Sequence, residues 1–418
     1  MAGRNIFSER ALASLIRSGD SQKFGIDLKE HRDSIIAGAS AAAGSGSVDL
    51  SQFSLVQIRG KSCAYYNDYN TVLLLRAISR HLRNRLRVVT PNRNKIVRGV
   101  VETLLDGTPM HATRRDISSF YETIPISAIR DRLIYDTASS ALVRTYLKTF
   151  FETHCPMEKD HGVPRGIGLS ALISELAMRT FDQSVRDFRG VYKYYRFADD
   201  ILVFSTCESS EVSGFLLDNL PTPMTFNPEK SDEVCFPGKK EADLGGRSLD
   251  YLGYEFTAKQ VNGNRDSRHV RVSISQRKLK KIQSRVILSF KDYARTGDWG
   301  LLKDRVKYLS ANFRVQRQGA EFVRSSRNVF SGIYFNYPLC GEYQYKSSVM
   351  RCSAYDSREL KELDGFYHSM LRKISGGITP SQLLQMKRLS FNKGYELRIR
   401  VRFYPRRISE INRGWRNA

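Results

Sequence analysis

Two adjacent carboxylates, Asp199 and Asp200, lie within the string Y-Y-R-F-A-D-D-I-L-V-F at residues 194–204. Tyr, Phe, Ile and Val favour β-strands and Asp favours turns, so the pattern predicts a hairpin with residues 198–200 at its bend. Two like charges at one bend repel each other, and a divalent cation such as Mg²⁺ would relieve this repulsion by binding the carboxylate oxygens. A solvated turn is the simpler explanation of an isolated Asp-Asp pair, so the choice depends on other residues.

A third carboxylate, Asp116, lies in the string H-A-T-R-R-D-I-S-S-F-Y-E-T-I at residues 111–124. The apolar residues Ile117, Phe120 and Tyr121 predict a strand with Asp116 at its start. A two-metal site for phosphoryl transfer needs carboxylates from more than one strand, so Asp116 could complete the set begun by Asp199 and Asp200.

Three further segments could serve such a site. The loop G-V-P-R-G-I-G-L-S at residues 162–170 precedes a helical pattern, and its glycines permit close approach to a ligand, although a simple tight turn would use the same residues. Lys230 follows a turn at Asn227-Pro228. The alternating string L-D-Y-L-G-Y-E-F at residues 249–256 predicts two strands that meet near Gly253.

The net charge of +24 and the pI near 9.8 favour a polyanionic partner. Nucleic acid fits better than a membrane surface, because the basic residues are not confined to one amphipathic anchor helix. The start of the chain has no apolar signal segment, and no apolar run is long enough to cross a membrane, so a cytoplasmic protein is expected. The six cysteines are scattered and predict neither a disulfide framework nor a zinc knuckle.

Basic residues gather in particular segments. Residues 72–82 predict an amphipathic helix with a basic face that includes Arg76 and Arg80, suited either to solvent or to phosphate contacts, and the basic cluster continues past this helix to Arg98. The small residues of 37–47 predict a mobile loop. Residues 273–330 hold fourteen basic and four acidic residues and predict a helical module.

The last 33 residues, 386–418, hold ten basic and two acidic residues with aromatic residues between them. This mixture suits single-stranded nucleic acid, since phosphates meet charge and bases stack on rings. Trp415 fits that role and equally fits packing against the body of the protein.

In order and spacing, these segments resemble the palm and fingers motifs of reverse transcriptases. The resemblance runs from about Arg83 to Phe256 and rests on five strings: D-I-S-S-F-Y, G-V-P-R-G-I-G-L-S, F-A-D-D, N-P-E-K-S and L-D-Y-L-G-Y-E-F. Phe197 departs from the tyrosine that most of the family has there, but it keeps the ring. The resemblance implies an α+β right-hand polymerase with fingers, an antiparallel-sheet palm and a helical thumb and carboxy-terminal region.

The same resemblance implies roles for particular residues. Asp116 and Asp199 would bind two Mg²⁺ ions, with Ile117 and Asp200 beside them, and Lys230 would be the general acid for pyrophosphate. Tyr121 would exclude a ribose 2′-hydroxyl and so favour dNTPs. The other implied nucleotide-binding residues are Phe120, Arg165 and Arg87, with Arg85 and Arg93 as alternatives to Arg87. The implied nucleic-acid-binding residues are Gly166, Ser170, Phe197, Arg93, Lys278, Lys281 and Arg285.

Among reverse transcriptases, the pattern D-I-x-x-F-Y-E and the strings L-S-A-N-F and G-I-Y-F-N-Y are most similar to bacterial defence-associated enzymes of the second type. Such an enzyme copies a structured partner non-coding RNA into cDNA during anti-phage defence. Template-independent or protein-primed DNA synthesis and a non-catalytic RNA-binding scaffold are the alternatives. The implied domains are an N-terminal region with fingers (1–110), a palm (111–262), a thumb (263–330) and a basic C-terminal region (331–418).

Overall fold

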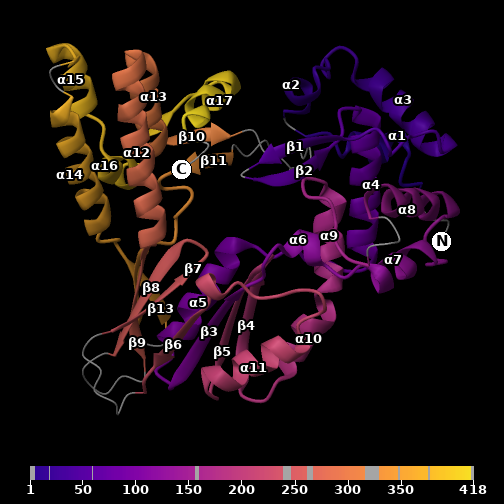
Figure 1. Cartoon of the computed structure of the whole chain (residues 1–418), viewed down its shortest axis with the longest axis horizontal. Helices are drawn as coiled ribbons and strands as arrows, with labels where there is room; N and C mark the ends of the chain where they lie inside the picture. Colours follow the sequence, from indigo (N-terminus) through magenta and orange to yellow (C-terminus); the bar gives the residue numbers. More distant parts are fainter. Residues whose placement is uncertain are drawn as a thin grey trace. The chain divides into compact units, whose positions relative to one another are not determined.

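The computed structural model describes residues 5–17, 19–58, 60–155, 160–238, 246–260, 267–315, 329–346, 349–374 and 377–415. It confirms a mixed α+β fold with mainly antiparallel sheets (Figure 1). The helices are α1 (Glu9–Ala13), α2 (Asp20–Phe24), α3 (Arg32–Ser45), α4 (Tyr69–Arg85), α5 (Arg93–Leu105), α6 (Phe120–Thr123), α7 (Ser127–Ile134), α8 (Ala141–His154), α9 (Gly168–Ala177), α10 (Arg179–Asp187), α11 (Ser209–Asn219), the 3₁₀ turn η1 (Pro228–Lys230), α12 (Gln276–Thr296), α13 (Trp299–Ser310), α14 (Arg358–Lys373), α15 (Pro380–Lys387), α16 (Phe391–Glu396) and α17 (Pro405–Arg413).

The strands form four sheets among the described residues, with orders β1-β2, β4-β5-β3-β6, β13-β12-β9-β8-β7 and β11-β10-β14. The strands are β1 (Ser54–Ile58), β2 (Lys61–Tyr65), β3 (Met110–Asp116), β4 (Val191–Phe197), β5 (Asp200–Ser205), β6 (Asp232–Phe236), β7 (Arg247–Tyr251), β8 (Tyr254–Gln260), β9 (Arg268–Ile274), β10 (Asn312–Val315), β11 (Val329–Gly332), β12 (Gly341–Lys346), β13 (Val349–Ser353) and β14 (Arg400–Val401).

The chain divides into two compact units. Residues 1–92 and 111–233 build the first unit, and residues 93–110, 234–315 and 327–418 build the second. The division of the chain into fingers, palm, thumb and C-terminal region stays a prediction.

In the first unit, α3 corrects one expectation. Residues 37–47 were expected to form a loop, but α3 covers most of them and packs against α4 and α1. Alanine has the highest helix propensity, and the small side chains of Ala39 and Ala43 are buried in the core. A run of small residues therefore marks close helix packing here.

Helix α4 forms where the apolar spacing predicts it, and Asp68 caps it by accepting a hydrogen bond from the Thr71 N–H. Its arginines are less available than expected. Arg76 pairs with Asp20 at 2.6 Å, and Arg80 donates to the hydroxyl of Ser14 and the carbonyl of Ala11. These two arginines hold the amino-terminal helices to α4 and do not form an open phosphate-binding face.

The sheet β4-β5-β3-β6 supports the carboxylates identified in the sequence. Every residue of β5 after Asp200 is buried, and helices α10 and α11 contact β4 and β5, respectively. Strand β3 ends at Asp116, where the sequence predicted a strand to begin. The carbonyl of Asp116 accepts a hydrogen bond from the Asn227 N–H, and Ser119 (φ 46°) turns the chain into α6.

The second unit contains the predicted strand pair β7 and β8, joined by a turn at Leu252 (φ 50°) and Gly253 (φ 79°). Helix α5 contacts strands of the same sheet, and α12 lies against α13 and α14. The predicted helical module is confirmed for α12 and α13, but residues 312–315 form strand β10. Residues 316–328 lie outside the described residues.

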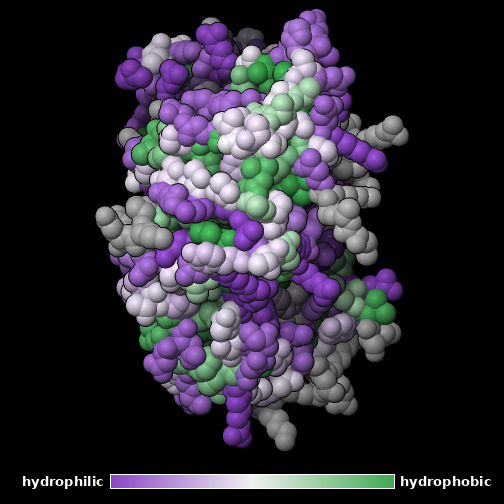
Figure 2. Space-filling model, turned by 90° about the vertical axis from the view of Figure 1, so that its right-hand side faces the viewer, coloured by the Kyte–Doolittle hydropathy of each residue, from purple (hydrophilic) through white to green (hydrophobic). Residues whose placement is uncertain are grey.

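The surface in Figure 2 is largely hydrophilic, with hydrophobic side chains in separate patches. None of the described helices is both long and apolar enough to cross a membrane.

Candidate active site

The Asp-Asp string forms the predicted hairpin. In the pairing of β4 with β5, Phe197 lies opposite Asp200, so the turn consists of Ala198 and Asp199. Ala198 adopts the left-handed conformation (φ 56°) that two-residue hairpin turns favour. Asp200 was expected in the bend, but it is the first residue of β5.

Strand β3 brings the third carboxylate to this turn. Asp116 lies directly opposite Asp200 in the antiparallel pairing of β3 with β5. The backbone N–H of Ile117 donates a hydrogen bond to the Asp199 carbonyl oxygen at 2.9 Å. The end of β3 is therefore joined to the hairpin turn, and three carboxylates come together.

Two cations pair with these carboxylates. Lys230 Nζ lies 2.7 Å from Asp116 Oδ1, and the turn that carries the lysine is held by a hydrogen bond from the Asn227 N–H to the Asp116 carbonyl. Arg114 grips Asp200 with both ends of its guanidinium, Nε to Oδ1 at 2.9 Å and Nη2 to Oδ2 at 3.1 Å. Such a two-point contact fixes the orientation of the Asp200 carboxylate.

Burial is the main influence on the pKa values of the two carboxyl groups in the hairpin. It raises the pKa of Asp199, and the negative charge of Asp116 adds to this rise, whereas Lys230 opposes it. Burial also raises the pKa of Asp200, and the bonds from Arg114 offset only part of the rise. These carboxylates therefore favour a nearby positive charge.

The donor chemistry fits a divalent metal. Asp116 and Asp199 offer hard oxygen ligands, and Asp199 forms no ion pair with any described residue. Asp200 is better suited to support, because Arg114 occupies both of its oxygens. In the described part of the chain, no three acidic, histidine or cysteine side chains form a complete metal-binding group.

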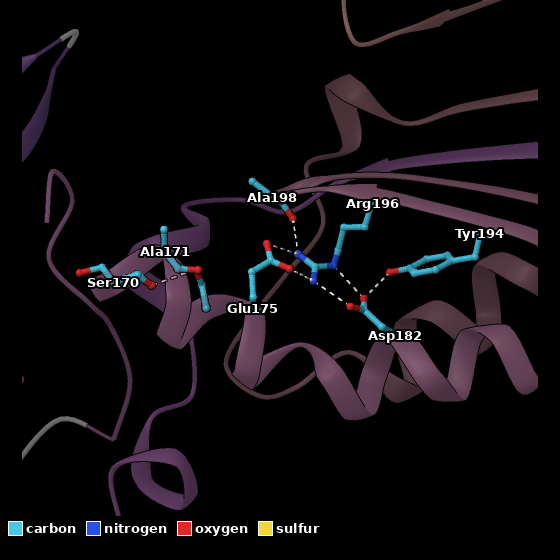
Figure 3. A network of polar contacts seen from close by, with 8 residues as sticks. Ser170, Ala171, Glu175, Asp182, Tyr194, Arg196 and Ala198 are labelled. Atoms are coloured by element: carbon cyan, nitrogen blue, oxygen red, sulfur yellow. Dashed lines mark hydrogen bonds and ion pairs between the residues drawn. The ribbon is translucent and has the colours of Figure 1, made fainter. Parts of the chain in front are cut away.

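A buried arginine beneath the turn holds the hairpin to the neighbouring helices (Figure 3). Arg196 donates to both carboxylate oxygens of Asp182 at 2.7 Å and to Oε2 of Glu175 at 2.8 Å. Its Nη1 also donates to the Ala198 carbonyl at 3.1 Å. The side chain is 4% exposed, so these acids on α9 and α10 compensate its charge where water does not.

The nucleotide-binding candidates Tyr121 and Arg165 lie together. The Arg165 guanidinium lies 5.1 Å from the ring centre of Tyr121 and makes two bonds to the Glu122 carboxylate, at 2.5 and 2.8 Å. The Val163 N–H donates to the Tyr121 carbonyl at 2.7 Å, which joins the glycine-rich loop to α6. Phe120 is 2% exposed and supports Tyr121 from the core.

Other loop residues have structural functions. A Cβ at Gly166 would lie 2.4 Å from the Ala64 carbonyl, and Gly166 has φ 95°, so the fold itself requires glycine there. Ser170 is 1% exposed, and its carbonyl accepts a hydrogen bond from the Ser174 hydroxyl (Figure 3). A direct contact of the Ser170 side chain with nucleic acid would require α9 to move.

Of the three arginines considered for the triphosphate, Arg87 is the most accessible. It is exposed and has φ 49°, two residues after the end of α4. Arg85 donates to Asp136 and Ser139. Arg93, in the second unit, donates to the carbonyls of Leu252 and Asn336, so its predicted nucleic-acid contact competes with a structural function.

The other nucleic-acid candidates of the second unit lie on α12. Lys278 is exposed, while Lys281 and Arg285 are half-buried. The Arg285 guanidinium lies 5.2 Å from the ring centre of Trp415. Trp415 is 3% exposed and donates to the Ser289 hydroxyl. It therefore packs against the body of the protein and is not free to stack on nucleic acid.

Arg114, Glu122 and the Arg196 network were missed in the sequence. Arg114 precedes Asp116 by two residues, so alternation along a strand places both side chains on one face and could have identified it. The partners of Arg196 come from two helices, and no local spacing identifies them.

Comparisons with known proteins agree with this geometry. Residues 67–256 match the family model described as reverse transcriptase (RNA-dependent DNA polymerase). Two solved structures are distantly similar. The apo telomerase of Candida tropicalis, truncated from its C-terminal domain, shares 11% identity over 44% of this chain and 42% of its own, with a TM-score of 0.31. The telomerase of Candida albicans, in complex with a fragment of telomeric RNA, shares 10% identity over 81% of this chain and 48% of its own, with a TM-score of 0.33.

The chain thus spans less than half the length of each of these telomerases. The family match covers both β3, with Asp116, and the hairpin of Asp199 and Asp200. Residues 67–256 therefore form a reverse transcriptase domain.

Proposed function

We propose that the protein makes cDNA from RNA at Asp116 and Asp199, with two Mg²⁺ ions as cofactors. The observation that carries this proposal is the convergence of β3 and the β4-β5 hairpin, which places Asp116 opposite Asp200 and next to the turn at Asp199. Bound there, two Mg²⁺ ions would lower the pKa of the primer 3′-hydroxyl and neutralise charge on the triphosphate.

The chain's own residues position the reactants around that chemistry. Arg114 orients Asp200, and Arg196 holds the Ala198 carbonyl and with it the turn. Lys230 donates a proton to the leaving pyrophosphate, for which its ammonium group on Asp116 is suitably placed. The backbone of Ile117 ties β3 to the turn and completes the metal-binding region.

The incoming dNTP lies against Tyr121, whose ring would clash with a ribose 2′-hydroxyl. Arg165 stacks on that ring and is held by Glu122, so it can contact the nucleotide without moving far. Phe120 supports the ring, and Arg87 contacts the triphosphate.

The template is a structured partner non-coding RNA, and the cDNA product serves anti-phage defence. The support for this partner is the resemblance of the sequence motifs, together with the net charge of +24. The proposed template-binding residues are Gly166, Ser170 and Phe197 near the hairpin and, in the second unit, Arg93, Lys278, Lys281 and Arg285.

Primer extension tests the catalytic proposal. The purified protein is given a DNA primer on an RNA template with dNTPs and Mg²⁺. Asp199→Asn keeps the shape of the side chain but removes its charge, and product formation is expected to fall by at least about a hundredfold. Asp218→Asn changes an exposed residue of α11 and is the matched control. Undiminished product from Asp199→Asn would contradict the proposal.

Sequencing the nucleic acid that co-purifies with the protein tests the partner. One structured RNA, with cDNA complementary to it, is expected. A random mixture of cellular RNAs, or protection against phage that survives Asp199→Asn, would count against a dedicated template.

A further inference from the structure

Three arginines near strand β14 each lie over an aromatic ring. The guanidinium of Arg398 is 4.4 Å from the ring centre of Tyr334, that of Arg400 is 4.5 Å from Phe330, and that of Arg402 is 5.8 Å from Tyr404. We call these three arginines and the rings beneath them, including Phe335, the arginine–aromatic strip. All of it belongs to the second unit.

Among the described residues, no acidic side chain compensates the positive charge of the strip. Arg398, Arg400 and Arg402 are exposed, and in the part of the chain that the structure describes none of them forms an ion pair. Other arginines of the same unit do have acidic partners, as Arg305 has Asp292 and Arg407 has Asp304. Three neighbouring cations without carboxylates favour an anionic ligand.

The strip is preorganised by one buried side chain, Asn312. Its amide donates to the Ile399 carbonyl at 3.1 Å, between the first two arginines, and the backbone N–H of Asn312 donates to the same carbonyl at 2.8 Å. Its side-chain oxygen accepts from the N–H of Tyr334 at 2.9 Å and of Phe335 at 3.3 Å. Asn312 thus joins the segment that carries arginines to the segment that carries rings.

The rings set the direction of the arginines. A guanidinium held over a ring still has N–H groups that can reach a phosphate, and its outer face can stack on a base. Arg400 also lies 5.9 Å from Phe335, which stacks on Phe330, so two rings share its support. The strip therefore offers the two contacts that single-stranded nucleic acid uses, charge and stacking.

The spacing suits a chain of phosphates. Arg400 begins β14, the edge strand of its sheet, and Arg402 follows directly after the strand; two residues of extended chain span about 6.7 Å. Regularly spaced charges of this kind match the repeated phosphates of an extended strand better than one isolated carboxylate.

We propose that the arginine–aromatic strip binds single-stranded RNA. This binding site lies outside the residues of the proposed polymerase site, and it does not depend on the chemistry there. It gives the RNA a second point of attachment to the protein.

Salt-dependent binding tests the proposal on the full chain. The probe is a fluorescently labelled oligouridylate, and its affinity is measured between 50 and 200 mM salt for the wild type and for Arg398→Ala/Arg400→Ala/Arg402→Ala. Three lost phosphate contacts reduce the slope of log affinity on log salt by about 2. The wild type's advantage over this variant then shrinks roughly twentyfold across that range.

Two further variants distinguish a specific contribution of the arginine–aromatic strip from a general effect of positive charge. Lys29→Ala/Arg32→Ala/Lys148→Ala removes three exposed cations from the first unit and is expected to leave the slope nearly unchanged. Arg398→Lys/Arg400→Lys/Arg402→Lys keeps the charge but loses the flat guanidinium, so the slope is retained while affinity falls.

Equal losses in the strip variant and the first-unit control would overturn the proposal, because they would show that only net charge matters. Tighter binding of a labelled polyglutamate peptide than of oligouridylate would also overturn it and indicate an acidic protein partner. Primer extension on a short template is measured alongside, so that a failure of catalysis is distinguished from a failure of RNA binding.

Discussion

The ammonium group of Lys230 lies 2.7 Å from Oδ1 of Asp116, and the lysine side chain is about one-third exposed. Lys230 is thus tied to the Asp116 carboxylate and still open to solvent on one side. A group in this position can meet both a bound triphosphate and the water that restores its proton.

Lys230→Ala is expected to lower kcat for nucleotide addition by about 10²–10⁴-fold, because proton donation to the leaving group is lost. The KM for dNTP is expected to change much less. Single-turnover incorporation of one nucleotide measures both values. Glu229→Ala, in the same 3₁₀ turn, is the control and should keep the wild-type rate. A normal kcat in Lys230→Ala would exclude the lysine as the acid.

Tyr121→Ala is expected to relax discrimination against ribonucleotides, because the ring that meets the 2′-hydroxyl is removed. The ratio of kcat/KM for dNTP over rNTP should fall by about 10- to 100-fold. Tyr121→Phe keeps the ring under Arg165 and should keep the ratio. Unchanged discrimination in Tyr121→Ala would mean that another group reads the sugar.

Arg196→Met is expected to destabilise the first unit by about 3–5 kcal/mol, because Asp182 and Glu175 would be left buried without their cation. Urea unfolding of the purified protein measures this change. Arg189→Met alters an exposed arginine just before the same strand and should cost under about 0.5 kcal/mol. Similar stability in both variants would show that the network contributes little.

Acid should destabilise the first unit partly through His154. Burial lowers the pKa of His154 to about 4, whereas an exposed histidine titrates near 6.5. The unfolded chain therefore gains a proton before the folded chain does. This contribution to stability is complete above pH 6.5 and is lost as the pH falls from 6.5 towards 4, by at most about 3 kcal/mol.

His154→Phe tests this contribution, because it keeps an aromatic ring beside Phe53 and Phe150 and cannot bind a proton. The loss of stability between pH 7 and 5 should be smaller in this variant than in the wild type. His31→Phe replaces an exposed histidine and should leave the difference as it is. An identical pH dependence in His154→Phe and the wild type would refute the assignment.

Local patterns in the sequence predicted the hairpin, the strand pair at Gly253 and helices α4, α9 and α12. Each depends on a period of apolar residues that a single element imposes. The sequence predicted that Asp116 and Asp199 belong to one metal site, because in reverse transcriptases, which it resembles, the corresponding carboxylates share a site. The prediction that a strand begins at Asp116 was wrong, because β3 ends there, and the Asn227 N–H that bonds to the Asp116 carbonyl comes from a distant segment.

The functions of arginines were the hardest to predict. Arg76, Arg80 and Arg93 look alike in the sequence, and each contacts a carboxylate, hydroxyl or carbonyl group far along the chain. The helix α3 was missed for a related reason, because alanines and glycines look unstructured until a neighbouring helix buries them. The arginines that are available to a ligand can be identified only when the arginines bonded within the protein are known.

Because β5 pairs with both β3 and β4, this strand cannot easily gain or lose a residue. Residues after Asp200 in β5 are buried, so one inserted residue there would turn each later side chain to the opposite side. If the later residues instead kept their pairing with β3, Asp200 would move one position past Asp116. We therefore expect natural variants to differ in length elsewhere and to keep this short strand free of insertions and deletions, even where its individual side chains are exchanged.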